Sequence, residues 1–156
     1  MLLFVYGTLK NGFSRQGALS GQRYLGTAQT KQNYGMFTHG GYPAMVDEKL
    51  AEQSNVQATK SLYGELYEVD EICLQNLDKI EGVDFDLFER KIVELEHLHL
   101  MRLPIFQNTF NLLEKKQAQA YFFKRSVTGC ADCGSFWSSK LLEIYLCFFK
   151  STKKKL

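Results

Sequence analysis

A glycine-centred turn near the N-terminus and a single carboxylate farther along are the two features of this chain that could do chemistry together. The turn, Tyr-Gly-Thr-Leu at residues 6–9, follows a short apolar run at residues 2–5 that is typical of a buried strand. Glycine lets the backbone bend sharply and approach a ligand closely, so successive amides from Gly7 onward could converge on an anion. Glu81 offers a carboxylate that could move protons. An anion cradle and an isolated base would together form an active site.

Glu81 falls on the apolar side of a predicted helix. Asp70 is a good N-cap, and Gly82 stands where a glycine commonly ends a helix. At 100° per residue, Leu74, Leu77 and Glu81 share one side, with Glu81 only ~20° from Leu74. The carboxylate is therefore expected to point toward the core or toward a cleft in it.

Burial and the negative end of the helix dipole both disfavour the charged form of Glu81, and this combination has two explanations. In the structural one, Glu81 pairs with Arg90 or Lys79, or the helix frays and releases it to water. In the functional one, its raised pKa suits proton transfer near neutral pH. Asp78, on the more polar side, is expected to be a surface or hydrogen-bonding residue rather than the second member of a dyad.

The secondary structure predicted around the turn and Glu81 contains more strands than helices. Patterning predicts six strands, at residues 2–6, 23–30, 34–37, 61–69, 88–100 and 117–127. Gly64, inside the fourth, indicates a bulge or a close backbone approach. Shorter helices are expected at residues 14–19 and 138–149, although the second could equally be a strand. Many strands with few helices, in no regular alternation, predict a mixed α+β fold.

Four short motifs occur in order between residues 4 and 90. They are Phe-Val-Tyr-Gly-Thr-Leu-Lys-Asn-Gly at 4–12, Gly-Tyr-Pro-Ala at 41–44, Gly-Glu-Leu-Tyr-Glu-Val at 64–69, and Leu-Asp-Lys-Ile-Glu-Gly at 77–82 followed by Arg90. In type and spacing they resemble the gamma-glutamylcyclotransferase-like superfamily, and most closely its gamma-glutamylamine cyclotransferase branch.

The resemblance implies a small mixed, mostly antiparallel β-barrel with flanking helices and a reaction that needs no cofactor. The substrate would be a small gamma-glutamyl amine or amino acid, whose α-amine attacks its own γ-carbonyl to give 5-oxoproline and a free amine. The family's catalytic glutamate falls on Glu81. Its substrate-binding loop falls on Tyr6, Gly7, Thr8 and Leu9.

Three departures from the family pattern bear on substrate identity. Phe88 stands two residues before Arg90, where the family often has a tyrosine. The segment at 97–116 is longer than a usual hairpin connection, and the chain diverges after Trp137. These departures motivate a second hypothesis, a catalytically silent member of the same fold that binds a small molecule or a protein.

A third hypothesis is a small zinc protein, because Cys130 and Cys133 have zinc-ligand spacing and His97 and His99 could place two imidazoles on one strand face. The structural alternative is a cysteine-containing loop beside an alternating strand. No second Cys-x-x-Cys pair exists, so we expect no metal site.

Composition predicts one domain at residues 1–150 and a basic, disordered tail at 151–156. A net charge of +2 gives no electrostatic case for nucleic acid. The longest apolar stretch is too short to span a bilayer, and no signal peptide is evident. We therefore expect a cytoplasmic protein that contacts neither membrane nor nucleic acid, with its oligomeric state left open.

Overall fold

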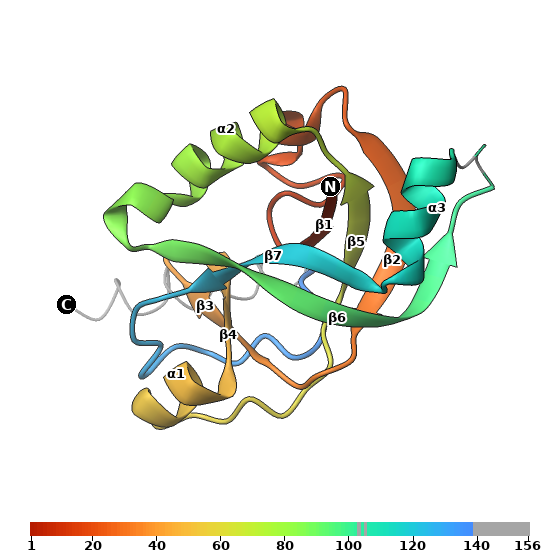
Figure 1. Ribbon diagram of the computed structural model, residues 1–156. Coiled ribbons are helices and arrows are strands. Elements are labelled where there is room, and N and C mark those ends of the chain that lie inside the picture. The colour runs from red at the N-terminus through yellow and green to blue at the C-terminus, as the bar shows by residue number, and fades with distance from the viewer. Residues whose placement is uncertain (103, 105, 139–156) are drawn as a thin grey trace.

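Five strands close into a barrel in the computed structural model, which describes residues 1–102, 104 and 106–138 (Figure 1). In barrel order they are β1 (Leu2–Val5), β5 (Tyr63–Glu68), β2 (Arg23–Thr30), β6 (Phe88–Leu100) and β7 (Gln117–Phe123). Neighbouring strands are antiparallel except for β1 and β7, which pair in parallel and close the barrel. The expected mixed, mostly antiparallel barrel is thus confirmed.

A separate hairpin and several helices flank the barrel. The hairpin consists of β3 (Gly35–His39) and β4 (Tyr42–Val46). The helices are α1 (Glu48–Gln53), α2 (Glu71–Glu81) and α3 (Gln107–Glu114), with short 3-10 turns η1 (Gln16–Leu19) and η2 (Val83–Phe85). In Figure 1, α2 and α3 lie along different sides of the barrel, and α1 lies below the hairpin.

Strand β1 contributes to two apolar clusters because its alternate side chains point in opposite directions. Leu2 and Phe4 belong to one cluster, which also contains Leu66, whereas Leu3 and Val5 belong to the other, which contains the apolar side of α2. All four β1 side chains are buried. This double burial explains why the strand reads as a continuous apolar run.

Gly64 allows the close approach of β5 to β1 that its position in the sequence predicts. A Cβ atom there would lie 2.5 Å from the carbonyl oxygen of Val5 and 2.7 Å from the ring of Phe4. Either contact is far inside van der Waals distance, so only glycine fits.

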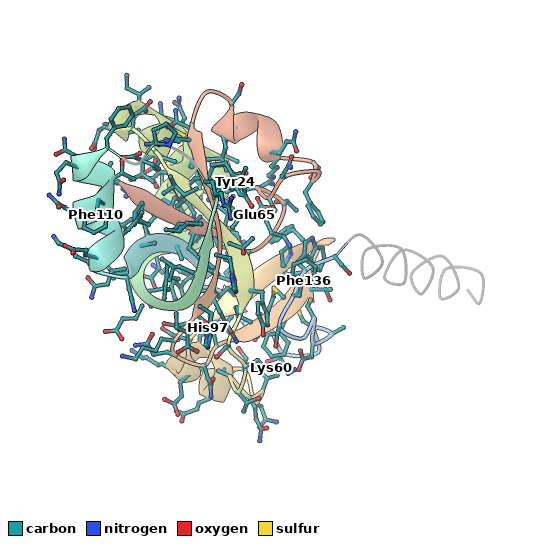
Figure 2. All side chains as sticks on the ribbon, turned by 90° about the vertical axis from the view of Figure 1, so that its right-hand side faces the viewer. Tyr24, Lys60, Glu65, His97, Phe110 and Phe136 are labelled. Atoms are coloured by element: carbon teal, nitrogen blue, oxygen red, sulfur yellow. The ribbon has the colours of Figure 1, made fainter. Side chains whose placement is uncertain are left out.

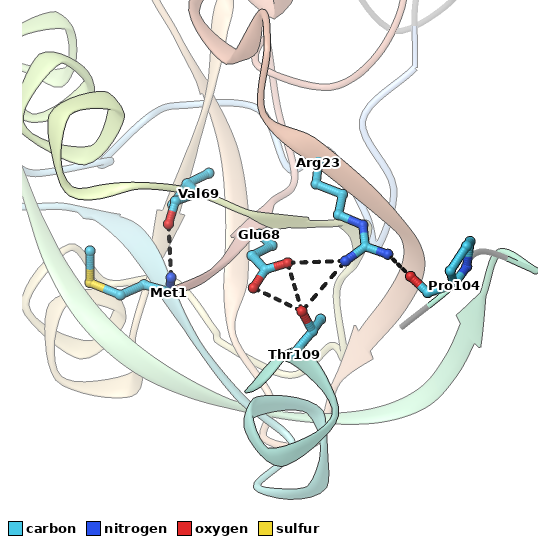
Figure 3. Close-up of polar contacts among 6 residues, drawn as sticks. All are labelled: Met1, Arg23, Glu68, Val69, Pro104 and Thr109. Carbon is cyan, nitrogen blue, oxygen red and sulfur yellow. Dashed lines mark hydrogen bonds and ion pairs between the residues drawn. The ribbon is translucent and has the colours of Figure 1, made fainter. Parts of the chain in front are cut away.

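Helix α3 docks on the barrel through a polar contact shown in Figure 3. The hydroxyl of Thr109 lies 2.9 Å from both carboxylate oxygens of Glu68, and the Arg23 guanidinium lies 3.5 Å from the same carboxylate. Arg23 also donates to the carbonyl of Pro104. The long connection at 97–116 therefore holds the end of β6 and a helix that packs against β2 and β5.

Several boundaries differ from those predicted. Strand β7 ends at Phe123 rather than residue 127, residues 16–19 form a 3-10 turn, and β3 runs on to His39. Strand β4 and helices α1 and α3 were not predicted. The helix expected at 138–149 and the basic tail lie almost wholly outside the described residues. No helix in the described ranges is long and apolar enough to cross a membrane.

Candidate active site

Helix α2 forms as its end signals predict and carries Glu81 into the interior. The carboxylate of Asp70 accepts a 2.7 Å hydrogen bond from the amide of Cys73, and Gly82 ends the helix in the left-handed conformation at φ 67°. The buried side of the helix consists of Cys73, Leu74, Leu77 and Glu81. Only 6% of Glu81 is exposed. The charged residue thus shares the apolar face, as the helical spacing predicts.

The turn after β1 leaves a row of amides without an acceptor in the described part of the protein. The Gly7 carbonyl accepts from the Lys10 amide at 3.1 Å, and the Thr8 carbonyl accepts from the Arg15 amide at 2.9 Å, so the carbonyls are used internally. Among the described residues, the amides of Gly7, Thr8 and Leu9 donate to no protein acceptor. We call these three amides the cradle.

A cavity of about 390 Å³, measured with its open mouth, joins the cradle to Glu81. Its lining comes from the end of β1 and the following turn, from β4, α2, β6 and β7: Phe4, Val5, Tyr6, Gly7, Thr8, Leu9, Arg15, Tyr42, Pro43, Glu81, Phe88 and Tyr121. The five residues singled out by the sequence therefore line one cavity, although Leu9 and Glu81 are 72 positions apart in the chain.

Gly7 is required by close contact with the hairpin. A Cβ atom at this position would lie 2.5 Å from the Cγ atom of Pro43 and 3.3 Å from its Cδ atom. Because the proline ring is rigid, a side chain at residue 7 would push the cradle away from β4. The glycine that the sequence suggested for a sharp bend thus also permits tight packing.

Tyr6 holds the cradle in place through its hydroxyl. This hydroxyl donates to the carbonyl of Tyr121 at 2.8 Å and accepts from the amide of Met45 at 3.3 Å. Burial raises the pKa of Tyr6, and the nearby Glu81 raises it further. The phenol therefore stays neutral and ties the end of β1 to β4 and β7.

Arg15 is the charged partner of Glu81. Its Nη1 atom lies 3.6 Å from Oε1 of Glu81, an ion pair that is longer than a hydrogen bond. Burial raises the pKa of the Glu81 carboxyl, and Arg15 opposes that rise. The pairing with Arg90 or Lys79 that sequence reasoning considered is not formed. No local pattern pointed to Arg15, which reaches Glu81 only through the tertiary fold.

Arg90 forms an ion pair with Asp78 instead of with Glu81. The Nε atom of Arg90 lies 2.6 Å from Oδ1 of Asp78, and the Tyr121 hydroxyl donates to the same oxygen at 2.7 Å. Asp78 is therefore a hydrogen-bonding residue, as predicted. Its contacts lock α2 onto β6 and β7 and leave Glu81, one turn later, without a rigid partner.

The family can now be assigned. The pattern of the family described as "Gamma-glutamyl cyclotransferase, AIG2-like" matches residues 3–136, which include the cradle, the hairpin, α2 and the barrel. The chain belongs to this family. The resemblance read from the four motifs is thereby confirmed.

Two named relatives resemble the chain over about 60% of its length. A protein of Vibrio cholerae provisionally named a gamma-glutamylcyclotransferase is 36% identical over 93 residues, 60% of this chain and 71% of the relative. Gamma-glutamylaminecyclotransferase A of Danio rerio is 34% identical over 103 residues, 62% of this chain and 59% of the relative.

Solved structures share the fold. An AIG2-like protein of Mus musculus superposes with a TM-score of 0.62 at 19% identity, covering 88% of each chain. A protein of Pyrococcus horikoshii superposes with a TM-score of 0.61 at 18% identity, covering 93% of this chain and 97% of the other.

The rim of the cavity is aromatic in this gamma-glutamyl cyclotransferase family member. The Tyr42 hydroxyl lies 3.1 Å from Nδ1 of His39, and the ring of Phe88 lies 6.1 Å from that of Tyr42. Phe88 is buried, and its ring also packs edge-on against Phe123 at 5.2 Å. At this wall the cavity offers an apolar surface where a tyrosine would offer a hydroxyl.

Lys10 and Asn11 fasten the far side of the cradle turn. Nζ of Lys10 donates to the Trp137 carbonyl at 2.6 Å and lies 3.8 Å from the ring centre of Phe136. The amide of Asn11 donates to the Glu65 carboxylate at 2.8 Å. Glu65 and Phe136, both labelled in Figure 2, line a second cavity with Lys10. Burial lowers the pKa of Lys10 to about 8. Sequence reasoning did not assign this lysine a role.

The cysteine loop is built into the fold by its backbone. The amide of Cys133 donates to the Met36 carbonyl at 2.8 Å, and its buried thiol lies 3.8 Å from the Ala131 carbonyl. Burial raises the pKa of Cys133 to about 12, so the thiol stays protonated. Within the described ranges, no group of three or more His, Cys, Asp or Glu side chains is placed to hold a metal ion.

Proposed function

We propose that this chain is a cyclotransferase that releases 5-oxoproline and a free amine or amino acid from a gamma-glutamyl substrate, with Glu81 as general acid and base. The observation that carries the proposal is the cavity that joins the buried Glu81 carboxylate to the three cradle amides. Membership of the gamma-glutamyl cyclotransferase family supports it.

The reaction is intramolecular. The α-amine nitrogen of the glutamyl group attacks its own γ-carbonyl carbon and closes a five-membered ring. The bond between that carbon and the leaving nitrogen then breaks. Because nucleophile and electrophile belong to one molecule, holding the substrate in a folded conformation supplies much of the rate acceleration. The chemistry requires no external nucleophile and no cofactor.

Glu81 would transfer the proton. The α-ammonium must lose a proton before attack, and the leaving nitrogen must gain one as the bond breaks. One carboxylate can serve as base in the first step and as acid in the second. Burial raises its pKa toward the range in which both steps proceed near neutral pH. The loose contact with Arg15 leaves the carboxylate free to reorient between the two nitrogens.

The cradle would bind the negative charge of the substrate. Backbone amides of Gly7, Thr8 and Leu9 could receive either the glutamyl carboxylate or the oxyanion that develops on the γ-carbonyl. Tyr6 fixes the start of the cradle through its two hydrogen bonds, so the donors are held in place before the substrate arrives.

The test measures 5-oxoproline release from a panel of gamma-glutamyl amines and gamma-glutamyl amino acids. Glu81→Gln is assayed beside Glu71→Gln, the same chemical change on the exposed side of the same helix. We expect turnover by the native protein and by Glu71→Gln, with a loss of at least about 100-fold in Glu81→Gln. Equal turnover by Glu81→Gln and native protein would remove Glu81 from the mechanism.

The second candidate, a catalytically silent binding member of the fold, is favoured by Phe88, which replaces a hydroxyl at the cavity wall with an apolar ring. It predicts that the native protein binds gamma-glutamyl ligands in calorimetry, and that Glu81→Gln binds them equally well. It also predicts no release of 5-oxoproline from any member of the panel.

A further inference from the structure

Arg15 stands at the mouth of the cavity that holds Glu81, and nothing in the cyclisation chemistry requires a cation there. The side chain of Arg15 is 41% exposed, whereas that of Glu81 is 8% exposed. The arginine therefore lies between the buried carboxylate and solvent. Its backbone amide bonds to the Thr8 carbonyl at 2.9 Å, which places the residue at a fixed point beside the cradle.

We infer that Arg15 binds the carboxylate of the departing amino acid, so that the preferred substrates are gamma-glutamyl α-amino acids. This inference rests on the proposed function and deepens it. Arg15 would act as a specificity-determining residue for the leaving group, while Glu81 carries the proton transfers.

The order of the groups along the cavity sets the direction of the substrate. The glutamyl amine and the scissile nitrogen must both come within hydrogen-bond reach of Glu81, about 3 Å. The glutamyl part therefore occupies the inner end of the cavity, and the leaving group extends toward the mouth, where Arg15 lies. A guanidinium there faces the leaving group.

The position of the carboxylate in the leaving group then determines which leaving groups Arg15 can bind. In an α-amino acid, the carboxylate is attached to the carbon bonded to the scissile nitrogen. It therefore remains beside Glu81, whose Oε1 atom lies 3.6 Å from Nη1 of Arg15. In a lysine joined through its ε-amine, several methylene groups carry the carboxylate away, and an alkylamine has none. Arg15 thus distinguishes these classes by position and charge.

The charges around the mouth favour an anion. The hydroxyl of Tyr42 lies within the fields of two guanidinium groups, Arg15 and Arg125, and of one carboxylate, Glu81. Asp78, the neighbouring acid on α2, is neutralised by Arg90. A second carboxylate entering the mouth meets the half-exposed guanidinium of Arg15, which can bind it through two parallel hydrogen bonds.

Arg15 also links substrate binding to the state of Glu81. In the free protein its guanidinium faces Glu81 and favours the charged carboxylate. A substrate carboxylate competes for the same guanidinium, and the Glu81 carboxylate then loses part of its stabilisation. Glu81 becomes a stronger base once the substrate is in place. Conversely, removing the charge of Glu81 should leave Arg15 more available to the substrate.

The first measurement is the ratio of kcat/KM for gamma-glutamyl-alanine to that for gamma-glutamyl-ethylamide, which differ by one carboxylate. We expect Arg15→Gln to lower this ratio about 10- to 100-fold, the loss typical of one charged hydrogen-bonded contact. Arg15→Lys should retain part of it. The control is Arg102→Gln, the same change at an exposed arginine outside the cavity lining, which should leave the ratio unaltered.

The second measurement is independent of turnover. Binding of the same two ligands to Glu81→Gln is measured by calorimetry, with and without the added Arg15→Gln change. We expect gamma-glutamyl-alanine to bind about 10-fold or more tightly than the ethylamide to Glu81→Gln, and this preference to disappear in the double variant.

The outcomes separate the two proposals. An equal loss on both substrates in Arg15→Gln would assign the guanidinium to the glutamyl carboxylate and overturn the inference. Failure of Glu81→Gln to prefer gamma-glutamyl-alanine, or to bind either ligand, would overturn it as well. A binding preference that depends on Arg15, in a native protein that releases no 5-oxoproline, would support the inference while refuting the proposed reaction.

Discussion

Replacing Gly7 by alanine should displace the cradle through a single steric contact. The new Cβ atom would lie 2.5 Å from Cγ of Pro43. Carbon atoms pack at about 3.5 Å or more, so the turn and the hairpin must separate by about 1 Å. Overpacking of this kind costs about 1–3 kcal/mol of the free energy of unfolding. A 1 Å displacement of a positioning group can lower catalytic efficiency about 100-fold.

The experiment pairs this substitution with a control and a compensating change. Gly17→Ala introduces the same methyl group where no atom lies within 4 Å, and it should leave both stability and turnover close to native. Pro43→Ala removes the Cγ and Cδ atoms that the new methyl group would meet. In the double variant, Gly7→Ala with Pro43→Ala, we expect much of the lost 5-oxoproline release and unfolding free energy to return.

A double-mutant cycle measures the coupling free energy between Gly7→Ala and Pro43→Ala, which tests whether the two changes act through one contact. We expect a coupling free energy of about 1–2 kcal/mol in urea unfolding, with the double variant more stable than the sum of the single changes predicts. Strict additivity, or a Gly7→Ala variant that behaves like Gly17→Ala, would refute the steric reasoning. The cradle would then owe its shape to something other than its contact with β4.

Three further predictions concern ionisation and docking. Burial raises the pKa of Glu81, so the acid limb of the pH profile of kcat/KM for gamma-glutamyl-ethylamide should lie above pH 4.5. Arg15→Gln should move this limb to higher pH, because the cation that opposes the rise is gone. A move to lower pH would contradict this. The pKa of Lys10 falls to about 8 from 10.5, so the unfolded chain binds more protons between these values. Between pH 8 and 10.5, the unfolding free energy of the native protein should therefore increase by roughly 2 kcal/mol relative to that of Lys10→Met, with allowance for solvent screening. If urea titrations show no change with pH in the difference between the two proteins, this prediction is wrong. Thr109→Val leaves Glu68 without its hydroxyl donor and should cost about 1–2 kcal/mol, seen as a lower Tm; an unchanged Tm would show that the contact is dispensable.

The part of the site that lies on α2 could be predicted because its signals are local. The cap at Asp70, the stop at Gly82 and the helical spacing of Leu74, Leu77 and Glu81 all fall within one short segment. Strand β1 and the turn after it were equally visible. The meeting of these two elements in one cavity depends on the barrel. The residue types only suggested that the two could act together, and the family resemblance assigned both to one site.

The partners of the charged residues could not be predicted in the same way. Arg15 and Glu81 are far apart in sequence, and Arg90, which was considered as a partner of Glu81, pairs with Asp78 instead. Helix α3 has no side-chain cap at its start, and its hold on the barrel comes from Glu68 and Arg23 in other elements. Such pairings are decided by tertiary packing, which leaves no periodic trace in the sequence.

Because the side chains of β1 belong to both apolar clusters and the strand leads directly into the cradle, the cradle is anchored in the whole core. Truncating the side chain of Phe4 in one cluster or of Leu3 in the other should therefore loosen the same strand. The cradle therefore has no independent melting step: on heating, ligand binding and tertiary structure should be lost in a single transition. Improving the stability of either cluster should raise the temperature to which the site survives.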